Sequence, residues 1–279
     1  MLEFLQFFLI GISVSTFGSL VGAGGGFILT PVLLLLFPSH NSEIIAATSL
    51  FVVATNSISG TTAYLRLKRI DVKTGLIYGL AAFPFAILGT ILTAKTDRSF
   101  YDLFLGTSLL LLCLSLFQGP PKPIALNSEE QANKKNLKEK RIVTRNGKEY
   151  HYFFYFKRGI WVSSGLGFLA SFFGIGGGPL YVPTMIRFLR IPVHIATATS
   201  QFICFLASTT AVIAHTFQGN SKTMVGILIP LAIGAVLGGQ IGARISEKVK
   251  SDMITKIFII LLGIIACRLL YQGINSFYN

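Results

Sequence analysis

The chain has little charge, and acidic charge is the scarcest. Only 13% of its 279 residues are charged, with 11 Asp and Glu against 24 Lys and Arg. Apolar residues make up 52%, a balance that excludes an ordinary soluble domain. No acidic residue falls in the middle of an apolar run. Carboxylates inside membrane helices are the usual relays for cations and protons, so their absence disfavours a cation carrier. It favours a site of neutral donors, which suits an anion.

Cysteine is also scarce, and no chemical motif accompanies it. Cys113, Cys204 and Cys267 are scattered through apolar runs without a CxxC pair or a metal-site spacing. Small apolar packing residues are the ordinary interpretation of such cysteines. The sequence has no nucleophile–base pair and no cofactor motif. We therefore expect no enzyme activity, no cofactor and no bound metal.

Long apolar runs are abundant. Runs of about 20 apolar residues without charge are typical of membrane helices. They cover roughly 4–21, 44–65, 72–94, 100–117, 159–173, 195–217, 225–245 and 254–274. The first run lacks the basic start of a signal peptide, so we expect it to be retained.

Two further apolar runs, 27–37 and 179–189, have only 11 residues each. A helix of this length covers about 16 Å, roughly half of a hydrocarbon core of about 30 Å. A glycine triplet precedes each run and separates it from a longer one. The pattern predicts a helix that is broken at the glycines, or a hairpin element.

These broken segments belong to a duplicated unit. The sequence "FGSLVGAGGGFILTP" ends at Pro31, and "LASFFGIGGGPLYVP" ends at Pro183. Downstream, Thr48-Ser49 recurs as Thr199-Ser200. Paired broken segments in the two halves of a membrane protein are typical of a transporter binding site. Five segments in each half, an odd number, predict that the second copy is inverted relative to the first.

The predicted fold is therefore an all-α polytopic membrane protein with two inverted repeats of about five segments each, containing Gly-broken hairpin or half-length helices. The first repeat covers 1–117 and the second 159–279. A polar linker at 118–158 joins them, and we expect it to be partly disordered. A regulatory or partner-binding role for the linker stays open. The aromatic run 150–156 is typical of an interfacial anchor for the next helix.

The basic residues predict the orientation. If the N-terminus lies outside, 20 of the 24 Lys and Arg fall on the cytoplasmic side, and ten of these lie in the linker. This asymmetry follows the positive-inside rule. We therefore expect a multi-pass protein of the cell (inner) membrane, with both termini outside and the linker 118–158 cytoplasmic. The net charge of +13 is thus a topology signal and needs no nucleic acid.

The glycine triplets are candidate anion-binding elements. They are Gly24, Gly25 and Gly26 in the first copy and Gly176, Gly177 and Gly178 in the second. The first N–H groups of a helix have no internal partner and carry partial positive charge, and glycine lets a solute approach them. The alternative is that the glycines only allow close helix packing. Without the lysine of a P-loop, nucleotide binding is not expected.

A polar stripe follows each break and supplies further candidates for substrate binding. Its members are Thr48, Ser49, Asn56 and Ser57 in the first copy and Thr199, Ser200, Gln201 and Ser208 in the second. Hydroxyl groups near helix starts can donate hydrogen bonds to the oxygens of an anion. The alternative is ordinary hydrogen bonding between helices.

Four residues are candidates for a proton or anion relay. His40 and His194 flank the starts of the equivalent helices, and His215 lies nearer the membrane. Histidine can transfer protons near neutral pH, although interfacial loop positions are a plainer interpretation. Arg268 lies within the last apolar run and either extends toward the interface or draws anions inward.

At these residues the chain resembles the TauE/SafE family of bacterial membrane proteins, which are called sulfite exporters and permeases of organosulfur anions. The matching pieces are "GAGGGFILTP", "AATS", "GIGGGPLYVP", "HIATATS" and "GGQIGARI". They cover both halves and omit the linker. The resemblance implies an inner-membrane carrier of small sulfur-containing anions such as sulfite, sulfoacetate or thiosulfate. Phe27 stands where the second copy has Pro179, so the two breaks need not bind equally.

The expected function is secondary transport of a small sulfur-containing anion, sulfite or an organosulfonate such as sulfoacetate, in the export direction. An importer, or a channel-like pathway for thiosulfate or another small anion, is the alternative. A membrane-embedded enzyme or scaffold has no motif to support it. The expected partners are the sulfur oxyanion and the lipid bilayer, and a homodimer is left open.

Overall fold

The computed structural model describes residues 2–37, 40–117, 137–217 and 225–278. Within them, the first half contains α1 (Leu2–Val21), α2 (Gly26–Leu36), α3 (Ser42–Arg66), α4 (Val72–Thr93) and α5 (Arg98–Phe117). The second half contains α7 (Phe156–Phe172), α8 (Gly178–Arg187), α9 (Val193–Phe217), α10 (Val225–Lys248) and α11 (Ser251–Tyr278). One hairpin, β1 (Leu137–Val143) and β2 (Glu149–Tyr155), joins the halves. The prediction of a helical membrane protein is confirmed.

The helices have the lengths that a bilayer requires. Five of the described helices, α1, α3, α4, α9 and α10, are long and apolar enough to cross a membrane. The helices α2 and α8 have 11 and 10 residues, as the half-length runs predicted. Large apolar side chains such as Leu80, Leu111 and Trp161 are exposed on the outer helices. In a bilayer this surface faces lipid, where it needs no further burial.

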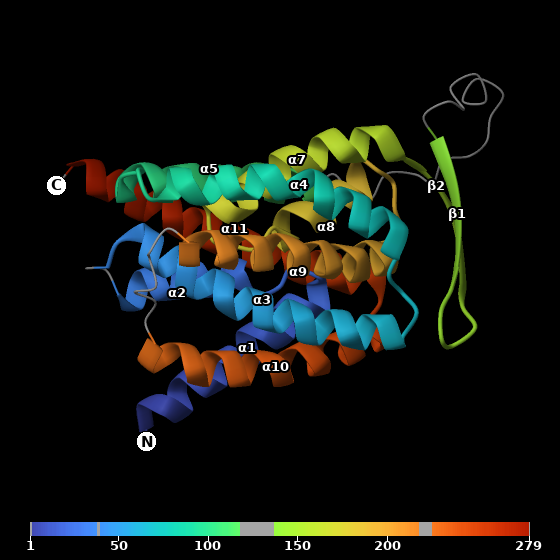
Figure 1. Cartoon of the computed structure of the whole chain (residues 1–279), viewed down its shortest axis with the longest axis horizontal. Helices are drawn as coiled ribbons and strands as arrows, with labels where there is room; N and C mark the ends of the chain where they lie inside the picture. Colours follow the sequence, from blue (N-terminus) through green and yellow to red (C-terminus); the bar gives the residue numbers. More distant parts are fainter. Residues whose placement is uncertain (1, 38–39, 118–136, 218–224, 279) are drawn as a thin grey trace.

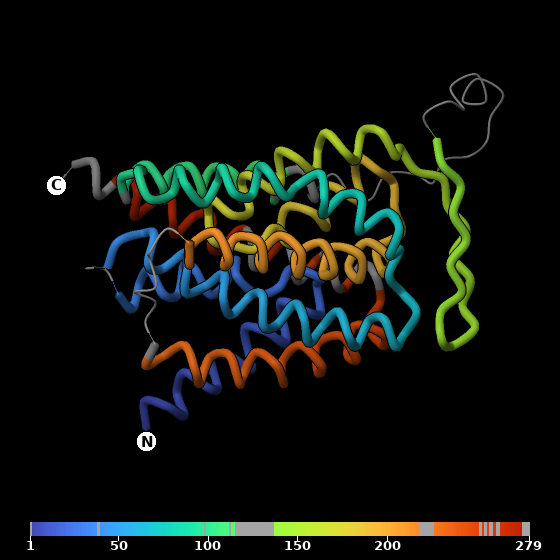
Figure 2. The backbone as a smooth tube through the Cα atoms, in the orientation of Figure 1, coloured from blue at the N-terminus to red at the C-terminus, as the bar shows by residue number. Residues whose placement is uncertain are grey.

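The two inner helices, α3 and α9, lie side by side and antiparallel. The chain just beyond the end of α3 contacts the start of α9, where an Arg69 guanidinium N–H lies 2.9 Å from His194 Nδ1. The long helices run roughly parallel to one axis, with both chain ends at one end of the molecule and the hairpin at the other (Figures 1 and 2). An inverted repeat requires this antiparallel course of α3 and α9. The inversion of the complete halves stays a prediction.

The halves are interleaved. The helix α1 packs against α10, and its counterpart α7 packs against α4, so the first helix of each half lies on the fourth helix of the other. Glycines make both contacts close. A Cβ atom on Gly238 of α10 would lie 2.6 Å from Ile12 O, and one on Gly89 of α4 would overlap Phe168 O. Small residues at such crossings let membrane helices approach closely.

The part of the linker that the structure describes, residues 137–155, forms an ordered β-hairpin, which the sequence did not predict. The strands β1 and β2 are antiparallel, with Lys140 opposite Tyr152. Alternate side chains of β2 face the helices, and Tyr152 and Phe154 are buried. The aromatic run is therefore a strand with one buried face. Residues 118–136 lie outside the described part of the chain.

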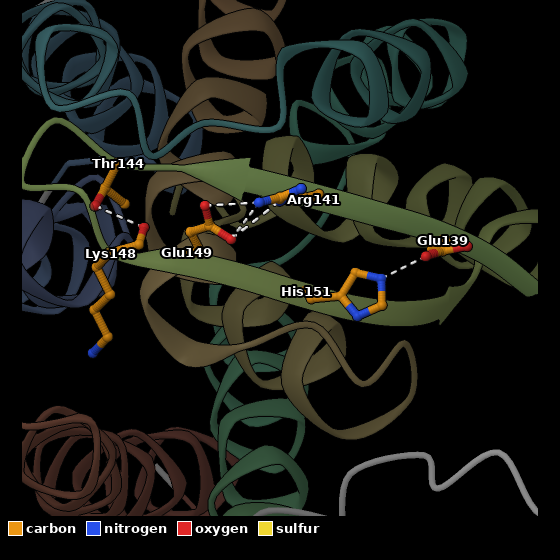
Figure 3. A network of polar contacts seen from close by, with 6 residues as sticks. All are labelled: Glu139, Arg141, Thr144, Lys148, Glu149 and His151. Atoms are coloured by element: carbon orange, nitrogen blue, oxygen red, sulfur yellow. Dashed lines mark hydrogen bonds and ion pairs between the residues drawn. The ribbon is translucent and has the colours of Figure 1, made fainter.

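The outer face of the hairpin carries ion pairs between the strands (Figure 3). Arg141 binds the Glu149 carboxylate with two guanidinium nitrogens, and His151 contacts Glu139. The inner face is tied to the helices, because Lys140 Nζ lies 3.0 Å from Asp71 Oδ1 at the start of α4. Burial, together with the Asp71 carboxylate, raises the pKa of Tyr152, whose hydroxyl donates to Asp71 Oδ2. The hairpin is thus fixed on this end of the bundle.

Candidate functional site

Each helix break is shaped by glycines in the left-handed conformation. The helix α1 ends at Val21 and α2 begins at Gly26, while α7 ends at Phe172 and α8 begins at Gly178. The residues just before the half-length helices, Gly25 and Gly177, both have φ of 82°. Side chains rarely tolerate this conformation, which glycine adopts freely. The two copies therefore build the same turn from the same triplet.

The two breaks cross at the centre of the bundle. A Cβ atom on Gly178 would overlap the backbone of Ala23, and one on Gly26 would lie 2.6 Å from Ile175 O. The third glycine of each triplet thus packs against the break of the other half. Both triplets are candidate residues from the sequence, and the structure places the two breaks in contact. At Gly26 and Gly178, however, backbone packs against backbone. These two glycines therefore fit the alternative that glycine serves close helix packing.

Polar side chains from both inner helices surround the first break. A Cβ atom on Gly24 would lie 3.1 Å from Ser57 Oγ of α3 and 3.5 Å from Cys204 Sγ of α9. The Gly24 N–H donates to Gln201 Oε1 of α9 at 3.2 Å. A Cβ atom on Gly176, the counterpart of Gly24, would meet the apolar side chain of Val53, while Gly176 O accepts from Cys204 Sγ. The polar site is therefore built mainly at the first break.

A chain of hydrogen bonds fixes the amide groups of this site. Gln201 Nε2 donates to Ser19 Oγ at 3.1 Å, and Ser19 Oγ donates to Asn56 Oδ1 at 2.9 Å. These bonds hold the carboxamide of Asn56 in one orientation. We call Gly24, Asn56, Ser57 and Gln201, together with Ser19, the central donor cluster.

Two donors of the central donor cluster have no partner among the described residues. They are Asn56 Nδ2 and Ser57 Oγ, and both side chains are 0% exposed. Leaving a buried donor unpaired costs about 1–3 kcal/mol, so buried polar groups normally have partners. Ser57 Oγ lies beside the glycine turn at Gly24, and Asn56 is the neighbouring residue, so both donors are free to bond an acceptor from outside the chain.

The Thr-Ser pairs are occupied by internal bonds. Ser200 Oγ donates to Gly22 O at 2.6 Å, and Thr30 Oγ1 lies 2.8 Å from Ser49 Oγ and 3.1 Å from Gly174 O. Gly22 and Gly174 occupy equivalent places in the two copies. The serines Ser49 and Ser200 therefore help to hold the break of the opposite half.

The other hydroxyls of the stripe also have internal partners. Thr48 Oγ1 donates to Ile44 O, and Ser208 Oγ donates to Cys204 O. Thr199 Oγ1 accepts the Asp71 N–H at 3.0 Å. The hydroxyls of these three residues are thus used in ordinary hydrogen bonds within and between helices. This is the alternative stated for the polar stripe.

The relay candidates are dispersed. His40 and Arg268 are exposed, and His194 contacts Arg69 at the hairpin end. His215 is buried in α9, and neither ring nitrogen has a partner among the described residues. It lies seven residues beyond Ser208, about two turns along the same helix. Of the four, only His215 combines burial with unpaired nitrogens.

Sequence reasoning missed Ser19, which bridges Gln201 and Asn56. A signal was present, since Ser19 recurs as Ser171 in the second copy. It also missed Arg69, which is buried at the hairpin end. Arg69 carries no distinguishing pattern, because several basic residues surround it in the sequence.

Comparison with known proteins decides the family. A family model described as sulfite exporter TauE/SafE matches residues 7–269. The chain belongs to the TauE/SafE family. It is thus a multi-pass membrane transporter and not an enzyme.

Relatives of this TauE/SafE protein cover nearly its full length. It is 32% identical to the probable membrane transporter protein YunE of Bacillus subtilis over 99% of this chain and 100% of that protein. It is 24% identical to a probable membrane transporter of Methanocaldococcus jannaschii, over 94% of this chain and 93% of the relative. For the probable membrane transporter protein YdhB of Bacillus subtilis the identity is 26%, over 88% and 90%. No solved structure matches the chain.

Proposed function

We propose that this transporter is a secondary carrier of small sulfur-containing anions, sulfite or an organosulfonate such as sulfoacetate, and that it exports them from the cytoplasm. The description of its family supports the chemical class of the substrate. The central donor cluster supports a negative solute, because it consists of two amide side chains, two hydroxyls and a backbone N–H, all neutral.

The unpaired donors of Asn56 and Ser57 carry the proposal. Sulfite and sulfonate oxygens accept hydrogen bonds, and bonds to a charged acceptor are worth about 1.5–3 kcal/mol each. Gln201 and Ser19 hold the Asn56 amide so that its oxygen is occupied and its nitrogen is free. An anion would satisfy both unpaired donors, whereas a cation would find no carboxylate among the residues of the cluster.

The membrane potential supports the proposed direction of transport. The hairpin end carries most of the basic residues described, and we place it in the cytoplasm according to the positive-inside rule. An interior potential of about −100 mV then favours outward movement of an anion by about 2.3 kcal/mol per charge. Export therefore needs no separate source of energy.

Flux measurements with purified protein in liposomes test this proposal. We expect saturable, protein-dependent movement of labelled sulfite or sulfoacetate under anaerobic conditions, with faster exit when the interior is negative. Counterflow against unlabelled anion is expected for a carrier. Flux without saturation or counterflow would favour the channel-like alternative, and net movement only inward would favour an importer. Absence of flux for every sulfur anion in both directions would contradict the proposal.

A further inference from the structure

Arg69 is a buried cation at the hairpin end of the molecule, with 3% of its surface exposed. The chain leaves α3 through Lys68, which has a φ of 54°. The Arg69 N–H then donates back to Tyr64 O at 3.2 Å. This turn directs the Arg69 side chain into the bundle, between the ends of α3, α9 and α10.

Within the described part of the chain, the groups that contact the Arg69 guanidinium are formally neutral acceptors or aromatic. One terminal nitrogen donates to Ser246 Oγ at 3.1 Å. The other lies 2.9 Å from His194 Nδ1 and 3.1 Å from His194 O. The guanidinium carbon lies 5.3 Å from the centre of the Tyr64 ring. Since a guanidinium has five N–H donors, two of them remain for another ligand.

The carboxylates adjacent in sequence to Arg69 and to its partner Ser246 are engaged elsewhere. Asp71 forms its ion pair with Lys140, and Glu247 accepts from Asn146 of the hairpin turn. Among the described ion pairs, none includes Arg69. Lys148 adds further positive charge near His194. A buried cation without a counter-charge is costly, and an anionic ligand would relieve that cost.

This place is connected to the central donor cluster. The Tyr64 hydroxyl lies 2.9 Å from Ser246 Oγ, which binds Arg69, and 2.6 Å from Ser19 O. On the other side, Thr197 Oγ1 donates to His194 O, and the Thr197 backbone packs against Gly22 at the first break. Arg69 and the central donor cluster are therefore joined through two short sets of contacts.

We propose that Arg69, with His194, Ser246 and Tyr64, forms a second anion subsite, where an oxyanion docks before it reaches the central donor cluster. The subsite rests on the proposed function and takes the same sulfite or sulfonate group. A planar guanidinium binds two oxygens of such a group at once, which a lysine cannot do. Concentrated positive charge in low-dielectric surroundings also attracts anions. Because the subsite lies at the hairpin end, it binds only anions that enter from that face of the membrane.

Arg69→Gln in liposomes of known orientation tests the subsite. We expect the KM for sulfite loaded from the hairpin face to rise at least tenfold, while the maximal rate and the KM from the opposite face stay within about twofold of wild type. The matched control is Arg66→Gln. Arg66 lies at the same end of α3 and is exposed, so this variant should keep the wild-type KM on both faces.

The outcomes separate the subsite from the proposed function. If wild type transports sulfite and Arg69→Gln leaves the KM unchanged, or raises it equally on both faces, the subsite is wrong and the proposed function stands. If wild type moves no sulfur anion, the proposed function itself fails. Should Arg69→Gln not fold, Arg69→Lys keeps the charge, and a smaller rise of KM confined to the hairpin face is expected. No rise in that variant would overturn the subsite.

Discussion

Asn56→Asp is expected to reduce sulfite flux by about a hundredfold while the protein stays folded. Aspartate has nearly the shape of asparagine and can still accept the hydrogen bond from Ser19 Oγ. It replaces the unpaired Nδ2 donor with a negative oxygen. The substitution therefore removes a charge-assisted hydrogen bond of about 1.5–3 kcal/mol and adds repulsion of the substrate. Initial rates in liposomes, normalised to folded protein, provide the measurement.

A control at another asparagine isolates the effect of the position. Asn41 precedes α3 and is exposed, and its replacement by aspartate suits the start of a helix. Asn41→Asp should therefore transport like wild type. Asn56→Ala removes the donor without adding charge, so its loss should be smaller, about tenfold. Equal rates for wild type and Asn56→Asp would show that the substrate does not approach Asn56.

Gly178→Ala is expected to disrupt the crossing of the two breaks. The added methyl group would overlap the backbone of Ala23, and neither main chain can move as freely as a side chain can. Overpacking of a closed contact typically costs about 1–3 kcal/mol, and more where backbone must shift. We expect thermal unfolding at a temperature several degrees lower, and a transport rate below about one tenth of wild type. Fluorescence-detected unfolding in detergent and liposome flux measure the two effects.

Another glycine provides the matched control for this substitution. Gly165 lies in α7, and a Cβ atom there would have nothing within 4 Å. Gly165→Ala should leave unfolding temperature and flux unchanged, or raise stability slightly, because alanine favours helix. A Gly178→Ala protein with wild-type stability and flux would mean that the two breaks are not in contact in the working protein.

The glycine triplets show what sequence can predict here. The 11-residue runs after each triplet predicted half-length helices, and α2 and α8 have this length. Repetition of the triplet also predicted that both copies use the same turn. Which residues of the two breaks touch, such as Gly26 and Ile175, could not be predicted, because they belong to segments far apart in the chain. Such a contact depends on how the helices cross, which local pattern does not encode.

The polar stripe shows a different limit. Its recurring residues predicted that α3 and α9 line the centre, and every stripe residue named as a candidate is buried. The sequence could not show which of these residues keep free donors. Ser200 and Ser57 have the same chemistry, yet Ser200 Oγ donates to Gly22 O, while Ser57 Oγ has no partner among the described residues. The two serines differ only in whether a carbonyl group lies within hydrogen-bond distance of the hydroxyl.

The hairpin was missed because composition concealed its periodicity. The segment from Leu137 to Val143 is rich in Lys, Arg and Glu, which favours the interpretation as a solvated linker. Its alternate residues nevertheless form a consistent pattern once β2 lies beside them. Lys140 turns inward to Asp71, whereas Arg141 turns outward to Glu149. In this strand, charged side chains face both ways, so alternation of apolar and polar residues gave no signal.

The central claim is that an anion binds at Asn56 and Ser57, beside the glycine turn at Gly24. A structure of the protein with a brominated sulfonate, solved from anomalous scattering, tests it most directly. The account predicts a sulfonate whose oxygens lie about 3 Å from Asn56 Nδ2 and Ser57 Oγ. A fully occupied sulfonate elsewhere in the bundle, with those two donors bound only to water or to protein, would contradict it.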